Sequence, residues 1–221
     1  MTQPHGIIAA VLTPLAGDLT PDLDAFVAYG RQLLGAGCHY LGMLGTTGEA
    51  NSIHLRDRLR LIAAAAEALP ADRLFVGTGA SSLAEAVEVT QCAATNGAKA
   101  VLVLPPFYYA PVTDTGVQAY YDRLIDAAAD ADLRVYLYNF PKLTGYRFTP
   151  ALIETLMMRH GPVIAGLKDS SGDFASMAQY AAIDSGFRVF AGTERYLLDI
   201  LDVGGAGCIS ATLNVTAALA R

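Results

Sequence analysis

Short apolar runs alternate with longer amphipathic segments along the whole chain. The apolar runs predict buried strands because they are brief, aliphatic or aromatic, and bounded by turn residues. We expect these strands at 6–13, 40–45, 74–79, 100–104, 134–139, 163–168, 188–191 and 207–210. The amphipathic segments between them predict helices at about 21–36, 54–69, 81–96, 114–130, 149–160, 173–184 and 194–203.

Residues with capping preferences support the predicted helix ends. Helices begin at Thr20-Pro21-Asp22, Ser81-Ser82 and Thr149-Pro150, because these polar side chains accept hydrogen bonds from free amide groups and proline fits the first turn. Gly37 and Gly97 end two helices, where glycine adopts the left-handed conformation readily. Strands and helices that alternate at this spacing predict a parallel sheet with helical crossovers.

The predicted fold is an α/β (β/α)8 TIM barrel that forms a single domain over residues 1–221. A doubly wound open sheet is the alternative, but eight strands with polar motifs at their C-terminal ends favour the closed barrel. Barrels of this type hold roughly 250 residues. Here residues 211–221 follow the last predicted strand, so we expect a barrel truncated within its last helix.

Composition narrows the class of protein. The chain has 221 residues, 53% of them hydrophobic, and a net charge of −6, which argues against a nucleic-acid partner. No apolar stretch reaches the roughly 18 residues of a membrane span, and the N-terminus lacks signal-peptide features. Three cysteines and four histidines are scattered, without the spacing of a disulfide framework or a metal site. We therefore expect a cytoplasmic protein without a metal, a cofactor or a membrane partner.

Lys168 is the most informative single residue. Three lysines occur against twelve arginines, and Lys168 ends the apolar run Val163–Leu167. Burial disfavours an ammonium group and lowers the pKa of a lysine, so a buried lysine can act as an amine nucleophile toward carbonyl carbon. The alternative is a strand-end lysine whose ammonium group extends to water. The motifs elsewhere in the chain favour the nucleophile.

Further chemical groups follow the other predicted strands. The loop Gly45-Thr46-Thr47-Gly48-Glu49 offers amide groups and hydroxyls for a carboxylate or phosphate oxygen, although such loops also form ordinary tight turns. Tyr138 ends the fifth strand, where a phenol can move a proton or simply pack in the core. Pro105–Tyr109 is an aromatic cluster for packing or oligomer contacts. Gly192-Thr193-Glu194 and Ser210 follow strands seven and eight as candidate polar contacts to a substrate.

The lysine, the tyrosine and the carboxylate-binding loop together support Schiff-base chemistry. Because active sites of such barrels lie at the C-terminal ends of the strands, we expect Lys168, Tyr138 and the Thr46-Thr47 loop to converge. The amine would attack a 2-oxo carbon, the loop would hold the adjacent carboxylate, and the phenol would move protons to and from a hydroxyl. The resulting iminium accepts electrons, so the neighbouring carbon–carbon bond can be made or broken.

The chain resembles the N-acetylneuraminate lyase and dihydrodipicolinate synthase family of class I aldolases. The resemblance runs from the first strand to the end of the chain. It rests on five motifs in the family's order, Gly45–Glu49, Pro106–Tyr109, Tyr138–Pro141, Gly166–Asp169 and Gly204–Ser210. It implies a TIM barrel, pyruvate or another 2-oxo acid as substrate, a homotetramer built as a dimer of dimers, and no cofactor besides the covalent imine.

The resemblance also implies a role for each motif residue. Lys168 forms the Schiff base and Tyr138 shuttles protons, while the Thr46-Thr47 pair binds the carboxylate and tunes Tyr138. Tyr108 is the tyrosine that the family lends across a dimer interface into the neighbouring site. The implied catalytic residues are therefore Lys168, Tyr138, Thr47 and Tyr108, and the implied substrate contacts are Thr46, Thr47, Gly192, Glu194, Ile209 and Ser210.

Two departures from the family's motifs bear on the substrate. Dihydrodipicolinate synthases carry an arginine for the carboxylate of aspartate semialdehyde where this chain has Leu143, which leaves Lys142 or Arg147 as substitutes. Sialic acid lyases carry an Asp-Glu pair where this chain has Glu194 and Arg195. These differences favour a smaller 2-keto-3-deoxy or 4-hydroxy-2-oxo acid.

Three functions stay open at this point. The first is a pyruvate-dependent Schiff-base lyase or aldolase that acts on such an acid. The second shares the lysine chemistry and is a condensation of the 4-hydroxy-tetrahydrodipicolinate synthase type or a 2-keto-3-deoxy acid dehydration. The third is a truncated, non-catalytic homologue that binds 2-oxo acids or only assembles with other copies, because family members normally continue into further C-terminal helices.

Overall fold

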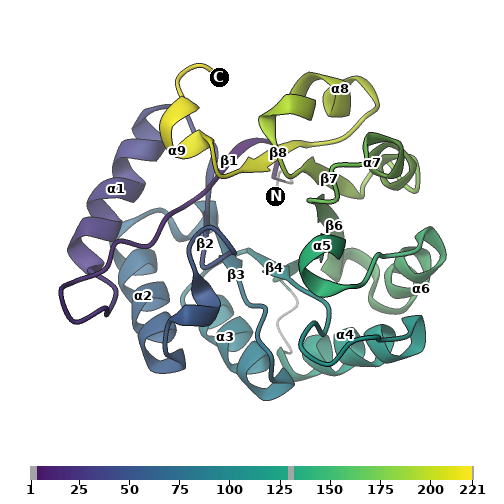
Figure 1. Cartoon of the computed structure of the whole chain (residues 1–221), viewed down its shortest axis with the longest axis horizontal. Helices are drawn as coiled ribbons and strands as arrows, with labels where there is room; N and C mark the ends of the chain where they lie inside the picture. Colours follow the sequence, from purple (N-terminus) through teal and green to yellow (C-terminus); the bar gives the residue numbers. More distant parts are fainter. Residues whose placement is uncertain (1–3, 129–131, 221) are drawn as a thin grey trace.

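Eight parallel strands close into a barrel in chain order in the computed structural model, which describes residues 4–128 and 132–220. Figure 1 shows the strands at the centre and the helices around them. The pairing of β1 with β8 closes the barrel, which confirms the predicted (β/α)8 TIM barrel over the doubly wound sheet. The strands are β1 (Gly6–Ala10), β2 (Tyr40–Met43), β3 (Leu74–Gly77), β4 (Ala100–Val103), β5 (Arg134–Asn139), β6 (Ile164–Asp169), β7 (Arg188–Ala191) and β8 (Gly207–Ser210).

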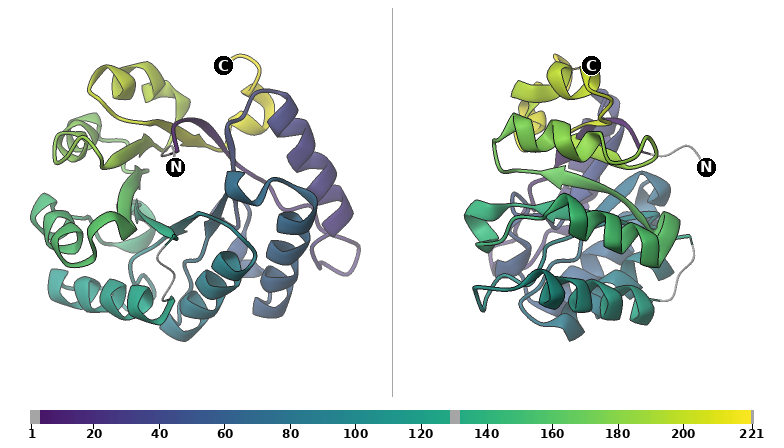
Figure 2. Two further views of the ribbon diagram at one scale, coloured as in Figure 1. Left: turned by 180° about the vertical axis from the view of Figure 1, so that it is seen from behind. Right: turned by 90° about the vertical axis from the view of Figure 1, so that its right-hand side faces the viewer.

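The helices form an outer ring that both views of Figure 2 show from other sides. They are α1 (Leu23–Gly35), α2 (Leu55–Ala68), α3 (Leu83–Thr95), α4 (Asp114–Ala128), α5 (Pro141–Thr144), α6 (Pro150–His160), α7 (Phe174–Ala181), α8 (Leu197–Asp202) and α9 (Leu213–Thr216). The helix predicted over 194–203 is shorter, because Glu194–Tyr196 forms a separate 3₁₀ turn. Positions 129–130 of the helix predicted over 114–130 lie outside the described residues. The short helix α5 was not predicted, whereas α9 lies in residues 211–221, where the sequence predicted the beginning of the last helix.

The predicted helix starts are confirmed by their hydrogen bonds. Asp22 caps α1 by accepting a bond from the amide of Ala25 at 2.9 Å. Thr149 caps α6 by accepting one from the amide of Leu152 at 3.2 Å, with proline at the first helical position. Ser82 caps α3 in the same way. Gly37 and Gly97 both have positive φ, as predicted for residues that end a helix.

The strands are buried on both faces, so two apolar layers form around the sheet. The inner layer fills the barrel and includes Ile8 from β1 and Phe75 from β3. The outer layer packs between the strands and the helices and includes Ile7 and Ala9. Several strands end earlier than predicted, because their apolar sequence continues into loops. Leu44, for example, leaves β2 with a φ of 54°.

A β-bulge in β6 sets the direction of the side chains that follow it. Val135 on β5 pairs with Ile164, but the next residue, Tyr136, pairs with Gly166, so β6 holds one extra residue. Ile164 and Leu167 both face the outer layer, although strict alternation would place them on opposite faces. With Leu167 facing outward, the next residue, Lys168, faces the inside of the barrel.

Candidate active site

Lys168 and Tyr138 meet inside the barrel at the C-terminal ends of β6 and β5. The two residues are register partners in the sheet, so their side chains leave neighbouring strands at the same height. Lys168 Nζ donates a hydrogen bond to the Tyr138 hydroxyl at 3.2 Å and lies 4.5 Å from the centre of the tyrosine ring. Lys168 is 6% exposed and Tyr138 4%, so neither group is fully solvated. The predicted convergence of these two residues is confirmed.

The surroundings of Tyr138 favour the ionised phenol. Burial by itself raises the pKa of Tyr138, because a buried phenolate loses its hydration. The charge of Lys168 and hydrogen bonds with Thr46, Lys168 and Ser170 outweigh burial, so the pKa of Tyr138 lies below its ordinary value. The phenol can therefore give up and recover a proton more readily than an exposed tyrosine.

A cavity of about 310 Å³ opens above the Lys168–Tyr138 pair. Its volume is at the lower end of the range for small-molecule sites. Its lining includes five of the residues that the sequence predicted for the site, namely Thr46, Thr47, Tyr138, Lys168 and Gly192. The remaining lining residues are Phe140, Asp169, Ser170, Gly172, Met177, Thr193 and Ala211.

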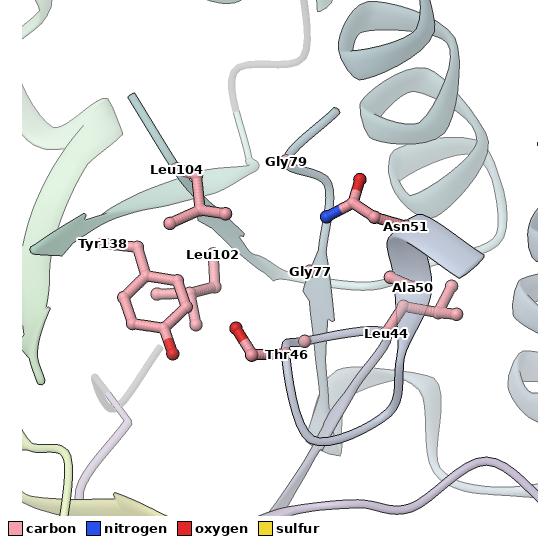
Figure 3. A pocket seen from close by; sticks show the side chains of 10 residues that line it. Leu44, Thr46, Ala50, Asn51, Gly77, Gly79, Leu102, Leu104 and Tyr138 are labelled. Atoms are coloured by element: carbon pink, nitrogen blue, oxygen red, sulfur yellow. The ribbon is translucent and has the colours of Figure 1, made fainter. Parts of the chain in front are cut away.

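The Thr46-Thr47 loop provides hydrogen-bond donors at this cavity. Leu44 and Glu49, both with a φ of 54°, lie on either side of the loop and give it a sharply turned backbone. Among the residues that the structure describes, no hydrogen bond uses the amide groups of Thr46 or Thr47. Figure 3 shows the Thr46 side chain directed toward Tyr138. Free amide groups and a hydroxyl beside a buried cation suit a carboxylate.

Asp169 faces away from Lys168, as expected for adjacent strand residues. Its carboxylate accepts hydrogen bonds from the Ser171 amide at 2.6 Å and from the Asn139 side-chain amide at 3.1 Å. Asn139 in turn accepts a bond from the Phe148 amide. Burial raises the pKa of Asp169, and these hydrogen bonds oppose the shift. Asp169 therefore anchors the loops behind β5 and β6 instead of pairing with Lys168.

Four other predicted site residues lie outside the 310 Å³ cavity. Glu194 and Ser210 are hydrogen bonded to each other and do not line it. Ile209 is buried and borders a much smaller space beneath Lys168. Tyr108 is 69% exposed and packs edge-to-face on Tyr109 at 5.0 Å. The entry of Tyr108 into a neighbouring subunit stays a prediction.

The two cations considered as substitutes for an arginine at Leu143 also lie outside the cavity lining. Arg147 Nη1 donates to Asp173 at 3.3 Å and to the Ser176 hydroxyl at 2.8 Å. Lys142 is exposed to solvent.

Sequence reasoning missed several lining residues. Ala211 directly follows a predicted strand and Ser170 lies two residues after another, so the rule that places sites at strand C-termini could have found both. Met177 lies on α7 and has no sequence signal that separates it from a core methionine.

Three of the four histidines hold positions with hydrogen-bond partners in the protein. His39 accepts a hydrogen bond from the Ile7 amide, His54 caps α2, and His160 bonds Asp122 at 2.6 Å. Within the described residues, no group of three or more His, Cys, Asp or Glu side chains is arranged to hold a metal ion. None of the helices in residues 4–128 and 132–220 is long and apolar enough to cross a bilayer.

Sequence comparison relates the whole chain to one family. Residues 3–221 match the dihydrodipicolinate synthetase family. An uncharacterized DapA-like lyase from Chloroflexus aurantiacus is 37% identical over all of this chain and 74% of its own length. A 4-hydroxy-tetrahydrodipicolinate synthase from Methanoculleus marisnigri is 33% identical over 96% of this chain and 72% of its own length.

Structural comparison gives the same relationship. YagE, a prophage protein of the dihydrodipicolinic acid synthase family from E. coli K12, was solved in complex with pyruvate. It superposes with a TM-score of 0.90 and 30% sequence identity, over 98% of this chain and 72% of the YagE chain.

Proposed function

The chain belongs to the dihydrodipicolinate synthetase family, and we propose that it is a lyase that forms an imine between Lys168 and a 2-oxo acid. The observation that carries the proposal is the buried Lys168–Tyr138 pair, 3.2 Å apart beneath a cavity with free amide groups. The pyruvate complex of YagE supports a 2-oxo acid as ligand, because that chain has the same fold and is 30% identical.

In the proposed reaction, the ammonium of Lys168 gives a proton to the phenolate of Tyr138, and the resulting amine attacks C2 of the acid. Tyr138 then returns that proton to the departing hydroxyl, so that water leaves and an iminium forms. The amides and hydroxyls of the Thr46-Thr47 loop hold the C1 carboxylate. The phenolate of Tyr138 takes the proton of the C4 hydroxyl as the C3–C4 bond breaks. The electron pair of that bond moves toward the iminium nitrogen and leaves an enamine and an aldehyde. Tyr138 then gives this proton to C3, and water hydrolyses the iminium to release pyruvate and the ammonium of Lys168.

We propose a 2-keto-3-deoxy or 4-hydroxy-2-oxo acid as the substrate class. Such acids carry the 2-oxo group and the C4 hydroxyl that the reaction requires. A second carboxylate at the far end would need a cation. Leu143 is uncharged, and Arg147 is already paired with Asp173.

The main alternative is condensation of pyruvate with an aldehyde, as in 4-hydroxy-tetrahydrodipicolinate synthase. The 33% identical relative with that name favours it. A dehydratase that releases the hydroxyl group of a 2-keto-3-deoxy acid shares the same lysine step. A protein that only binds 2-oxo acids is the alternative without catalysis.

The test is a substrate panel on the purified chain. The panel contains six-carbon 2-keto-3-deoxy sugar acids, 4-hydroxy-2-oxoglutarate, and pyruvate with aspartate semialdehyde. We expect at least one of the acids to release pyruvate, measured by coupled enzymatic reduction of the pyruvate and by mass spectrometry. Release should be lost in Lys168→Ala and kept in Lys142→Ala, which removes an exposed lysine. Consumption of pyruvate with the semialdehyde would favour the synthase, and no turnover by folded protein would contradict catalysis.

A further inference from the structure

Glu194 is surrounded by hydroxyl donors that belong to the protein itself. Its Oε2 atom accepts hydrogen bonds from the hydroxyls of Ser210 and Thr212. Its Oε1 atom accepts one from Thr216 Oγ1 at 2.6 Å. Ser210 and Thr212 also lie within hydrogen-bond distance of each other, at 2.9 Å. We call these four residues the Glu194 clamp.

The clamp joins two segments that both contribute to the cavity. Glu194 follows β7 directly after Thr193, whereas Ser210 and Thr212 lie on either side of Ala211 at the end of β8. Thr193 and Ala211 line the cavity, but no residue of the clamp does. The clamp therefore acts between two lining residues without reaching the cavity itself.

The strand pairing at this junction is short. β7 and β8 share two register pairs, against five between β5 and β6. Hydrogen bonds to a charged acceptor are stronger than those between neutral groups. The clamp thus supplies side-chain links where the backbone ladder supplies few.

We propose that Glu194 is a positioning residue that holds the Thr193–Ala211 side of the cavity and makes no contact with the substrate. The inference rests on the proposed function, in which the Thr46-Thr47 loop holds the carboxylate and Lys168 binds C2. The lining at Thr193 and Ala211 is then left for the part of the acid beyond C4. Substrate discrimination there then depends on lining residues such as Thr193, and the charge of Glu194 takes no direct part.

The decisive variant is Thr216→Val, which removes a clamp hydroxyl that does not line the cavity. Thr216 Oγ1 also lies 2.9 Å from the Thr212 carbonyl oxygen one turn earlier in its helix, which is a second acceptor for the same hydroxyl proton. Thr155→Val is the matched control, because Thr155 donates to the Ala151 carbonyl in the same way on α6, at 2.8 Å, and has no other hydrogen-bond partner among the described residues. Glu194→Gln is the third variant.

Two measurements separate the clamp from the chemistry. In Thr216→Val and Glu194→Gln, we expect faster amide hydrogen exchange over residues 211–216, because the clamp no longer restrains them. For a cleaved six-carbon 2-keto-3-deoxy acid, we expect KM to rise about three- to tenfold in both, the scale of one lost hydrogen bond. We expect kcat and covalent trapping of pyruvate by borohydride to stay unchanged, because Lys168 and Tyr138 are untouched. Thr155→Val should match the wild-type protein throughout.

A KM increase in Glu194→Gln without one in Thr216→Val would overturn the proposal, because it would make Glu194 a direct substrate contact. Unchanged hydrogen exchange in Thr216→Val would also overturn it. Failure of the wild-type protein to trap pyruvate would instead contradict the proposed function, and the exchange measurement would still decide on the clamp.

Discussion

Lys168 and Tyr138 depend on each other for their chemistry. The cation next to Tyr138 lowers the pKa of the phenol, which burial alone would raise. The phenol oxygen in turn accepts a hydrogen bond from Lys168 Nζ at 3.2 Å. A proton can therefore move between two buried groups without passing through water.

Tyr138→Phe tests the proposed proton transfer. We expect turnover to fall about 10²- to 10⁴-fold, the usual contribution of a general acid–base group, while imine formation on Lys168 persists. Tyr136→Phe is the matched control. Tyr136 lies on the same inner face of β5, and its buried hydroxyl has no hydrogen-bond partner among the described residues. Equal losses of turnover in the two variants would contradict a special role for Tyr138.

The pH dependence of turnover follows from the lowered pKa of Tyr138. If the phenolate is the base, kcat/KM for cleavage rises with pH through a pKa below the value of about 10 for free tyrosine. We expect this rise of kcat/KM with pH, the ascending limb of the pH profile, to be absent in Tyr138→Phe. In Thr46→Val the limb should move to higher pH, because one hydrogen bond that stabilises the phenolate is lost. A limb that persists in Tyr138→Phe belongs to another group.

At the scale of single residues, the sequence predicted the Lys168–Tyr138 pair and the Thr46-Thr47 loop beside it. Lys168, Tyr138 and Thr46 end or follow strands of one closed barrel, so topology alone brings them together. The surroundings of Glu194 could not be predicted in the same way. Its partner Thr216 lies on α9, a four-residue helix without a clear sequence pattern.

At the scale of elements, the bulge in β6 decides which face Lys168 takes. Alternation counted from Ile164 would place Lys168 on the outer face. The extra residue reverses the alternation of inward and outward side chains along β6, so Leu167 packs outward and Lys168 faces inward. A bulge of this kind leaves no mark in a period-two pattern, although glycine inside a strand is a common sign of one.

Gly166→Ala tests the importance of the bulge. A Cβ atom at Gly166 would lie 2.1 Å from the Arg188 carbonyl oxygen and 2.6 Å from Tyr136 Cε1. Side-chain rotation cannot relieve the contact with the backbone oxygen. We therefore expect the free energy of unfolding to fall by about 1–3 kcal/mol. We also expect slower imine formation in the protein that remains folded, because β6 must shift near Lys168.

Urea unfolding and the rate of imine formation check this prediction. Gly35→Ala is the control, since a Cβ atom placed there at the end of α1 meets no heavy atom of the described residues within 4 Å beyond its own turn of helix. If Gly166→Ala kept the stability and the rate of imine formation of the wild-type protein, the close packing of Gly166 against Arg188 and Tyr136 would be unimportant.

At the scale of the whole molecule, α9 connects the last strand to the first. Figure 1 shows α9 beside α1, near the end of β1. Asn214 on α9 accepts a hydrogen bond from the Tyr29 hydroxyl at 2.9 Å and donates one to the Ala10 carbonyl at 2.8 Å. It also bonds the Leu12 amide and the Ala211 carbonyl. One side chain thus links α1, β1 and the segment after β8.

Asn214→Ala should loosen this closure. We expect the free energy of unfolding to fall by about 1–3 kcal/mol, because backbone groups near the end of β1 lose their partner. Tyr29→Phe removes only the contacts of one hydroxyl with Asn214 and should cost less. A double-mutant cycle measured by urea denaturation should show coupling between the two changes. Additive effects would contradict a shared network.

The overall fold could be predicted because the strand–helix alternation extends over the whole barrel. All eight predicted strands occur, and the ends of β5, β7 and β8 agree with the predicted ranges. The ends of β1 and β2 could not be predicted, because apolar residues such as Val11 and Leu44 continue past the strands into loops. Fold thus follows from a repeated pattern, whereas site details depend on single contacts.

Covalent trapping tests the central claim most directly. The purified chain is incubated with pyruvate and reduced with borohydride, and the product is analysed by intact mass and peptide mapping. We predict one irreversible pyruvyl adduct confined to Lys168, absent in Lys168→Ala and retained in Tyr138→Phe. No adduct on folded wild-type protein, or an adduct on Lys99 or Lys142 instead, would contradict imine chemistry at this site.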